Sequence, residues 1–223
     1  MFLAEAYGTT KRIKNFLLLS EVQKQISSSK KSSSSEAQVL PAIGSLEVSN
    51  LTVSWNNVTN VLKSVSLSLE PGNLLVVTGP VGAGKSSFLT TLLEELVIKN
   101  GHFKVTGRVS FCPQEAWIFI GTVRENILFG AAYEAERYAE VIDAADLKRD
   151  FELLPDGDHS LIGDKGITLS GGQRARVNFA RAIYRRADFY LLDDPFSAVD
   201  PKVGKKLAQS VQTYLKVRDF TLT

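Results

Sequence analysis

A short apolar strand, a glycine-rich loop and a helix are predicted in succession from Leu74 to Val97, and this unit constrains the fold more than any other segment. The loop reads Gly79-Pro-Val-Gly-Ala-Gly-Lys-Ser86, the pattern G-x-x-x-x-G-K-S of a phosphate-binding loop. Gly79, Gly82 and Gly84 let backbone N–H groups converge on phosphate oxygens at the start of the helix. The context favours nucleotide binding over a glycine-rich turn without a ligand.

The side chains that follow the glycines carry the expected chemistry. Lys85 should reach the β- and γ-phosphates of a nucleotide, and the hydroxyl of Ser86 should ligate Mg²⁺. Ser87 is assigned to the same binding loop. The strand is expected over Leu74 to Thr78 and the helix over Ser86 to Val97.

Other runs complete the outline of the domain. Asn100-Gly101 is expected to stop the helix, and strands are predicted at Leu46 to Val53 and Val61 to Leu69. A buried-type strand is predicted from Phe189 to Asp193, and the carboxylate at its end is suited to hold Mg²⁺ through its water shell. A purely structural aspartate is the alternative, and the phosphate-binding loop favours the metal role.

Bulk properties fit a globular chain that does not cross a membrane by itself. The 223 residues are 44% hydrophobic, which is enough for one large domain with a core, and the net charge of +2 does not indicate a nucleic-acid surface. Cys112 is the single cysteine, so no internal disulfide can form. No early apolar run approaches the ~20 residues that span a bilayer.

The chain divides into three parts. Residues 1–26 carry a helical pattern with basic positions, and the serine-rich stretch within 27–42 is predicted to be a disordered linker. The β-rich runs begin after it, so residues 43–223 are expected to form the folded domain.

A second glycine-rich helix start lies at Leu169-Ser-Gly-Gly-Gln173. The exposed N–H groups of Ser170, Gly171 and Gly172 would form an anion site, with Gln173 completing the segment. The phosphate-binding loop of the chain does not itself require a second anion site. Val177, Ala180 and Ile183 mark the buried face of the following helix. The arginines at 174, 176 and 181 are expected to be solvated or paired, not ligands.

From Ile43 to Thr223 the sequence resembles the nucleotide-binding domain of an ATP-binding cassette (ABC) transporter, and more narrowly the first such domain of the C (multidrug-resistance-associated) subfamily. The resemblance rests on the phosphate-binding loop and on three further motifs: Thr122-Val-Arg-Glu-Asn-Ile-Leu-Phe-Gly130, Leu169-Ser-Gly-Gly-Gln-Arg-Ala-Arg-Val-Asn-Phe-Ala-Arg-Ala-Ile183 and Leu191-Leu-Asp-Asp-Pro-Phe-Ser-Ala-Val-Asp200. It implies an α/β P-loop NTPase of ABC type, with a mixed sheet core, flanking helices, a β-rich subdomain and a helical signature subdomain.

The resemblance also implies residue roles. Trp55 matches the aromatic that stacks on adenine, with a core or surface tryptophan as the alternative. Gln114 matches the glutamine that touches Mg²⁺ or the attacking water. The apolar stretch from Ala116 to Phe129 would line the groove that receives a coupling helix from the membrane domain, although core packing could explain much of it.

The partners that the resemblance implies are large. The segment Ser170 to Gln173 would close over ATP held by a second ABC nucleotide-binding domain in a head-to-tail sandwich, with Ser197 to Asp200 along the seam. The transmembrane domains of the same transporter would contact the chain through coupling helices, and residues 1–26 would be the exit from the first membrane region. ATP and Mg²⁺ are the implied cofactors, and no nucleic acid is expected as a partner. The resemblance places the transporter's domain at the cytoplasmic face of a membrane, and this chain alone is expected to be soluble.

Two departures from the family pattern bear on hydrolysis. The general base after Asp193 is usually glutamate, and here it is Asp194, whose carboxylate is about 1.5 Å shorter in reach. A misplacement of ~1 Å can reduce a rate on the order of 100-fold. The family's switch histidine has no counterpart, because His102 and His159 both precede the Ser197 loop and are expected at the surface. We therefore expect a weakly hydrolytic site, with the closing strands of the domain truncated.

Three functions are compatible with these motifs. The first is the ATP-binding domain of a membrane exporter, and the second is a nucleotide-gated regulatory module with negligible turnover. The third, a soluble cassette ATPase acting on DNA or ribosomes, is disfavoured by the exporter-like stretch from Thr122 to Gly130 and by the short spacing from Lys85 to Ser170. The transported substrate cannot be deduced, because the residues that would bind it lie in membrane helices.

Overall fold

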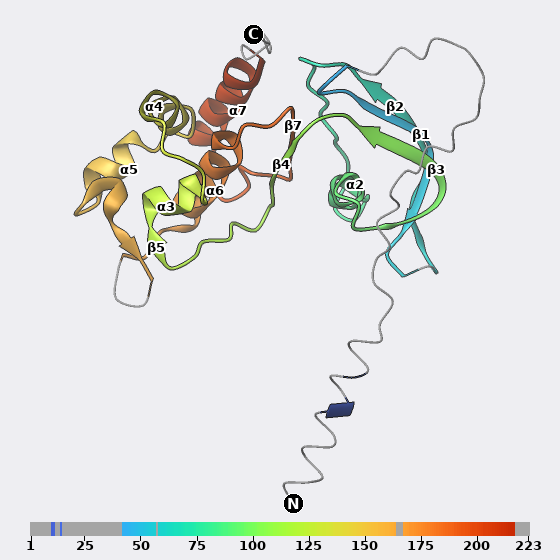
Figure 1. The fold of residues 1–223 in the computed structure, drawn as a ribbon, viewed down its shortest axis with the longest axis horizontal. Helices are drawn as coiled ribbons and strands as arrows, with labels where there is room; N and C mark the ends of the chain where they lie inside the picture. The colour runs from blue at the N-terminus through green and yellow to red at the C-terminus, as the bar shows by residue number, and fades with distance from the viewer. Residues whose placement is uncertain (1–9, 12–13, 15–41, 57, 164–166, 217–223) are drawn as a thin grey trace, which may run out of the picture.

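The computed structural model describes residues 10–11, 14, 42–56, 58–163 and 167–216. The predicted linker over 27–42 lies almost wholly outside this part, and so does most of the predicted helix within 1–26. Figure 1 shows two lobes, one with strands β1–β3 and helix α2, the other with helices α3–α7. The strands β4 and β7 lie between them. The architecture is α/β, as predicted.

The β-rich lobe is built on an antiparallel sheet of order β2-β1-β3. Its strands are β1 (Leu46–Ser54), β2 (Asn60–Leu69) and β3 (Val97–Val105). The central strand alternates, so that Leu46, Val48, Leu51 and Val53 are buried. These side chains form one hydrophobic core with Phe88 and Leu92 of α2 and with residues of β7. The strands predicted at Leu46 to Val53 and Val61 to Leu69 therefore form as β1 and β2, with bounds right to within a residue.

The prediction of a helix from Ser86 to Val97 was wrong in its second half. Helix α2 (Lys85–Leu92) is capped by Leu93, and the next residue, Glu94, has a left-handed backbone with φ 63°. The chain then enters β3, because Ile98, Phe103 and Val105 pack against the same core as β1. The predicted stop at Asn100-Gly101 lies inside β3.

The glycine at 101 has a structural explanation in the sheet. It lies beside an irregularity in the pairing of β1 with β3, between Ser49 and Thr52. Its φ is 76°, and a Cβ there would lie 2.3 Å from the carbonyl oxygens of Ser49 and Asn50. Only glycine permits this close approach, so the residue marks a bulge and not a helix end.

The predicted strand Leu74 to Thr78 is also not formed, and no described strand pairs with it. The side chains of Leu74, Leu75, Val76 and Val77 are exposed. An apolar run favours a strand only where a neighbouring strand supplies hydrogen bonds. The described strands that follow it pair elsewhere, since β4 (Val109–Cys112) pairs in parallel with β7 (Phe189–Leu192).

The helical lobe holds the second core. Its elements are β5 (Gly121–Thr122), α3 (Val123–Leu128), α4 (Ala135–Ala144), α5 (Lys148–Leu153), a 3-10 turn (Gly157–His159), β6 (Leu161–Ile162), α6 (Gly171–Tyr184) and α7 (Pro201–Lys216). The core is centred on α6, where Val177, Ala180 and Ile183 are fully buried as predicted. His102 and His159 are both exposed, also as predicted. In the described part of the chain, no helix is both long and apolar enough to cross a bilayer.

Candidate functional site

The phosphate-binding loop leads from Gly79 into α2. Gly82 and Gly84 have φ of 81° and 90°, so both turns need a residue without a Cβ. The ammonium of Lys85 lies back across the loop and donates to the carbonyl oxygens of Gly79 (2.9 Å) and Pro80 (3.0 Å). A cation is therefore held beside the N–H groups that begin α2, an arrangement that attracts a phosphate group.

Two of the three residues assigned to Mg²⁺, Ser86 and Asp193, come together although they lie 107 positions apart in sequence. The hydroxyl of Ser86 donates to Asp193 Oδ1 over 3.0 Å. Asp193 follows β7, and its N–H donates to the carbonyl of Cys112 at the end of β4 (2.9 Å). A hydroxyl and a carboxylate are suitable oxygen ligands for Mg²⁺, which keeps several waters and does not need an all-protein cage. Accordingly, the described residues hold no group of three or more His, Cys, Asp or Glu side chains placed for a metal.

Gln114 lies at the same edge of the sheet. It follows β4 by two residues, while Asp193 follows β7 by one, and Cys112 is the register partner of Leu192. Gln114 is exposed. Parallel strands end at a common edge, so the glutamine lies on the side of the sheet that carries Asp193.

Trp55, predicted to stack on adenine, lies directly after β1 and contacts the phosphate-binding segment. Its indole Nε1 donates to Ser87 Oγ over 3.2 Å, while the tryptophan remains 58% exposed. The core half of the alternative is therefore excluded, and stacking on adenine stays a prediction beside that of a surface tryptophan. An exposed aromatic surface next to the start of α2 is available to a planar base.

Asp194, the candidate general base, is exposed and has a left-handed backbone with φ 42°. Its carbonyl oxygen accepts from the N–H (3.3 Å) and the hydroxyl (3.0 Å) of Ser197. Aspartate tolerates this conformation better than most residues. The turn fixes the backbone of Asp194 and leaves its carboxylate at the surface.

Helix α6 begins with a complete capping box. Ser170 Oγ accepts from the Gln173 N–H (3.2 Å), and Gln173 Oε1 accepts from the Ser170 N–H (2.9 Å). A Cβ on Gly171 would meet no described atom within 4 Å, and one on Gly172 would lie 3.3 Å from the carbonyl oxygen of Ala198. The loop Ser197 to Asp200 thus lies against the start of α6.

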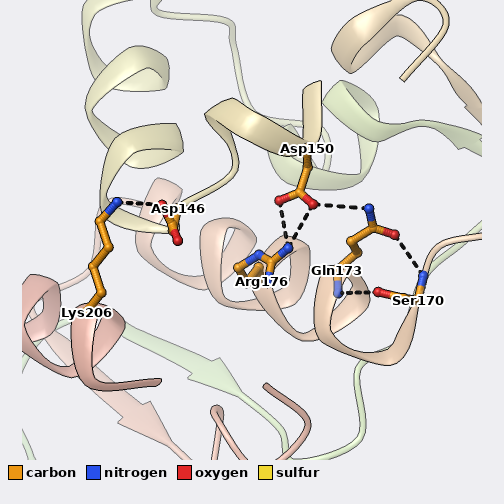
Figure 2. A network of polar contacts seen from close by, with 6 residues as sticks. All are labelled: Asp146, Asp150, Ser170, Gln173, Arg176 and Lys206. Atoms are coloured by element: carbon orange, nitrogen blue, oxygen red, sulfur yellow. Dashed lines mark hydrogen bonds and ion pairs between the residues drawn. The ribbon is translucent and has the colours of Figure 1, made fainter. Parts of the chain in front are cut away.

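Figure 2 shows a polar network next to this capping box, which was not predicted from the sequence. Asp150 of α5 accepts from Arg176 through both carboxylate oxygens (2.8 and 2.7 Å) and from Gln173 Nε2 through Oδ1 (3.1 Å). A second ion pair joins Asp146 to Lys206 of α7 (2.5 Å). The sequence signal for Asp150 was only an acidic residue in the first turn of a short helix, which does not identify its partner.

An aromatic cluster lies near the other end of α6, and we call it the Trp117 cluster: Trp117, Phe119 and Phe129, with ring centroids 5.7 to 6.0 Å apart. Trp117 and Phe129 are 57% and 51% exposed. Arg181 of α6 lies over both rings, at 5.4 and 5.1 Å from their centroids.

The segment Ala116 to Phe129 therefore divides between surface and core. The Trp117 cluster is at the surface, while Val123 and Ile127 are buried in the core of the helical lobe. Core packing explains the buried residues of the segment, and contact of its exposed residues with a coupling helix stays a prediction.

Comparison with known proteins agrees with this geometry. A family profile described as ABC transporter matches residues 62–197. The chain belongs to the ABC transporter family. It is 50% identical over 210 residues to mouse ATP-binding cassette sub-family C member 4, and 48% identical over 209 residues to the human protein of that name. A probable multidrug resistance-associated protein of Drosophila melanogaster, lethal(2)03659, is 43% identical over 188 residues.

These ABC relatives are much longer than the chain. The alignments cover 92%, 92% and 83% of the chain but only 15%, 15% and 14% of the three relatives. The resemblance to the C subfamily is confirmed, and the chain carries the ATP-binding domain typical of that subfamily. The activity of a whole transporter belongs to the proposal below.

Proposed function

We propose that the chain binds Mg²⁺-ATP as one of two ATP-binding domains of a membrane exporter, and that closure of the two domains drives transport. The observation that carries the proposal is the contact of the Ser86 hydroxyl with Asp193, next to Lys85, whose ammonium folds back over the phosphate-binding loop. A hydroxyl, a carboxylate and an ammonium at one loop are the groups that binding or transfer of a phosphoryl group requires.

Each group of the site has a role in this proposal. Lys85 exchanges its two carbonyl partners for the β- and γ-phosphates, and Trp55 stacks on the adenine. Ser86 and Asp193 would hold Mg²⁺, and Gln114, which follows β4, would reach the ion or the attacking water. When bound, the metal would supply positive charge that neutralises the phosphates.

Helix α6 serves a second nucleotide in this proposal, through the segment Ser170 to Gln173 at its start, which we call the signature segment. Helix α2 packs in the core of the β-rich lobe and α6 in the core of the helical lobe, on either side of β4 and β7 (Figure 1). The N–H groups of Gly171 and Gly172 therefore act on ATP held by a facing domain. The loop from Ser197 to Asp200, packed beside Gly172, lies at the seam between the two domains.

Hydrolysis at the chain's own site is weak in this proposal. The carboxylate of Asp194 is one methylene short of the glutamate that the family uses, and its backbone is fixed by Ser197. ATP binding, not turnover, is then the main contribution of this site. A regulatory module without turnover is the second candidate, and the same short carboxylate favours it.

The Trp117 cluster is the proposed contact for the membrane domains. It offers two half-exposed aromatic rings on a surface that α6 supports through Arg181. A coupling helix with apolar residues would bury these rings, in keeping with aromatic residues as interface anchors.

The test of ATP binding needs only this chain. Fluorescence titration with a trinitrophenyl-ATP probe, with and without Mg²⁺, should give saturable binding that excess ATP displaces. Lys85→Ala should abolish it, while Lys104→Ala, which removes an exposed lysine of β3, should leave it unchanged. Equal binding by both variants would refute the assignment of the site.

A further inference from the structure

Asp150 has two kinds of partner, and they connect different parts of the molecule. Its carboxylate pairs with Arg176, and both side chains are only 13% exposed. The same carboxylate accepts from the side-chain amide of Gln173 (3.1 Å). One group on α5 is thus bonded both to the body of α6 and to its first turn (Figure 2).

The bond to Gln173 fixes the orientation of its amide. The nitrogen faces Asp150, so the oxygen faces the Ser170 N–H. Meanwhile Ser170 Oγ accepts from the Gln173 N–H. Since a hydroxyl has one proton to donate, the Ser170 O–H stays available for an anion at the helix start.

We propose that Asp150 is a positioning residue for the signature segment: through Gln173 it holds the Ser170 hydroxyl and the first turn of α6 in the orientation that receives the γ-phosphate of the facing domain's ATP. The inference rests on the proposed function, because it assumes that the signature contacts ATP. The ion pair with Arg176 has a separate effect, which is to hold α5 against α6.

Four variants separate the two effects. Arg176→Met removes the ion pair and leaves the bond from Gln173 to Asp150. Gln173→Glu removes that bond, places two carboxylates together and leaves the ion pair. Asp150→Asn affects both partners. The double variant Asp150→Asn/Gln173→Glu exchanges donor and acceptor between positions 150 and 173, which restores a hydrogen bond there without restoring the ion pair.

The test uses the full-length transporter that the proposed function implies. The readout is the ATP concentration for half-maximal vanadate trapping of azido-ATP in the facing domain, with the melting temperature measured in parallel. Gln173→Glu and Asp150→Asn should each raise that concentration about tenfold, since each disturbs a hydrogen bond to a charged group. Arg176→Met should lower the melting temperature and change the ATP concentration less than about threefold.

The double variant is decisive. It should bring the ATP concentration back to within about threefold of the natural protein while its melting temperature stays low. The inference is overturned if the double variant is no better than Gln173→Glu, or if Arg176→Met raises the ATP concentration as much as Asp150→Asn does.

A fifth variant distinguishes failure of the inference from failure of the proposed function. Ser170→Ala removes the hydroxyl that Asp150 is proposed to position. If Ser170→Ala leaves trapping unchanged, the inference falls. The proposed function falls with it if Gly171→Asp, which places a carboxylate at the N–H groups of the same turn, also leaves trapping unchanged. If Ser170→Ala impairs trapping but Asp150→Asn does not, only the inference falls.

Discussion

Replacing Arg181 with methionine should destabilise the chain by about 3 kcal/mol, because its guanidinium connects α6 to Asn126 and Trp117 through three hydrogen bonds. It donates to the carbonyl oxygens of Asn126 (2.7 Å) and Trp117 (2.7 Å) and to Asn126 Oδ1 (3.0 Å). Asn126 is itself fully buried. The variant would leave these acceptors without their charged donor.

The magnitude follows from opposing effects. Three hydrogen bonds from a charged donor at ~1.5 kcal/mol each would give about 4.5 kcal/mol. Arg181 is partly buried, which desolvates its charge and lowers its pKa, so removing the charge recovers part of that cost. The cation–π contacts with Trp117 and Phe129 are replaced by sulfur–aromatic contacts of similar strength, about 1 kcal/mol. A net loss of about 3 kcal/mol remains.

The assay is urea unfolding in a Trp55→Phe background, so that Trp117 is the fluorescent reporter. Arg181→Lys should lose roughly half as much stability, since an ammonium cannot maintain the planar fork. Arg174→Met, at an exposed position of the same helix, is the matched control and should stay within about 0.5 kcal/mol of the natural chain. A loss below about 1 kcal/mol for Arg181→Met would refute the reasoning.

Single residues give three further predictions. Burial raises the pKa of the Cys112 thiol to about 12, so native protein at pH 8 should resist alkylation that denatured protein undergoes within minutes, as mass spectrometry would show. The Arg108 N–H lowers the pKa of Asp188, so this group stabilises the fold above its unfolded pKa of ~3.9 and the contribution is lost as pH falls below it. Asp188→Asn should therefore flatten the acid limb of a stability–pH curve. Asp194→Glu should raise ATP hydrolysis at this site on the order of 10- to 100-fold, measured as phosphate release by a full-length transporter whose facing site is inactivated, and a rate that stays at background would contradict the reach argument.

The sequence predicted local motifs better than it predicted which strands pair with one another. The glycine loop, the buried stripe of α6 and the acidic end of β7 each depend on residues close together in the chain, and all three are found as predicted. The strand at Leu74 to Thr78 failed because strand formation depends on a neighbour that its own residues do not encode. The helix was predicted too long because the residues from Val97 onward pair with β1 as strand β3, where Phe103 and Val105 pack against the core.

The network at Asp150 could not be predicted for a related reason. Asp150 and Arg176 lie 26 positions apart, and a single sequence with scattered acidic and basic residues offers many equivalent pairs. Only the packing of α5 on α6 selects this one. By contrast, Ser86 and Asp193, 107 positions apart, could be placed together, because the phosphate-binding loop and the strand that ends in an aspartate are both expected to hold the same Mg²⁺.

Helix α6 is held along its length by arginine side chains, and these contacts connect the Trp117 cluster to the signature segment at the start of the helix. Arg176 ties its first half to α5, and Arg181 ties its second half to the Trp117 cluster. At the helix end, the buried Arg137 donates to the carbonyl oxygens of Ile183 (3.0 Å) and Tyr184 (2.7 Å). A 14-residue helix spans about 21 Å and is stiff over that length. In the proposed transporter, a displacement of the Trp117 cluster is therefore expected to move Ser170 to Gln173 with it. Arg181 variants that loosen this contact should weaken the stimulation of ATP trapping by transported substrate more than they weaken trapping itself.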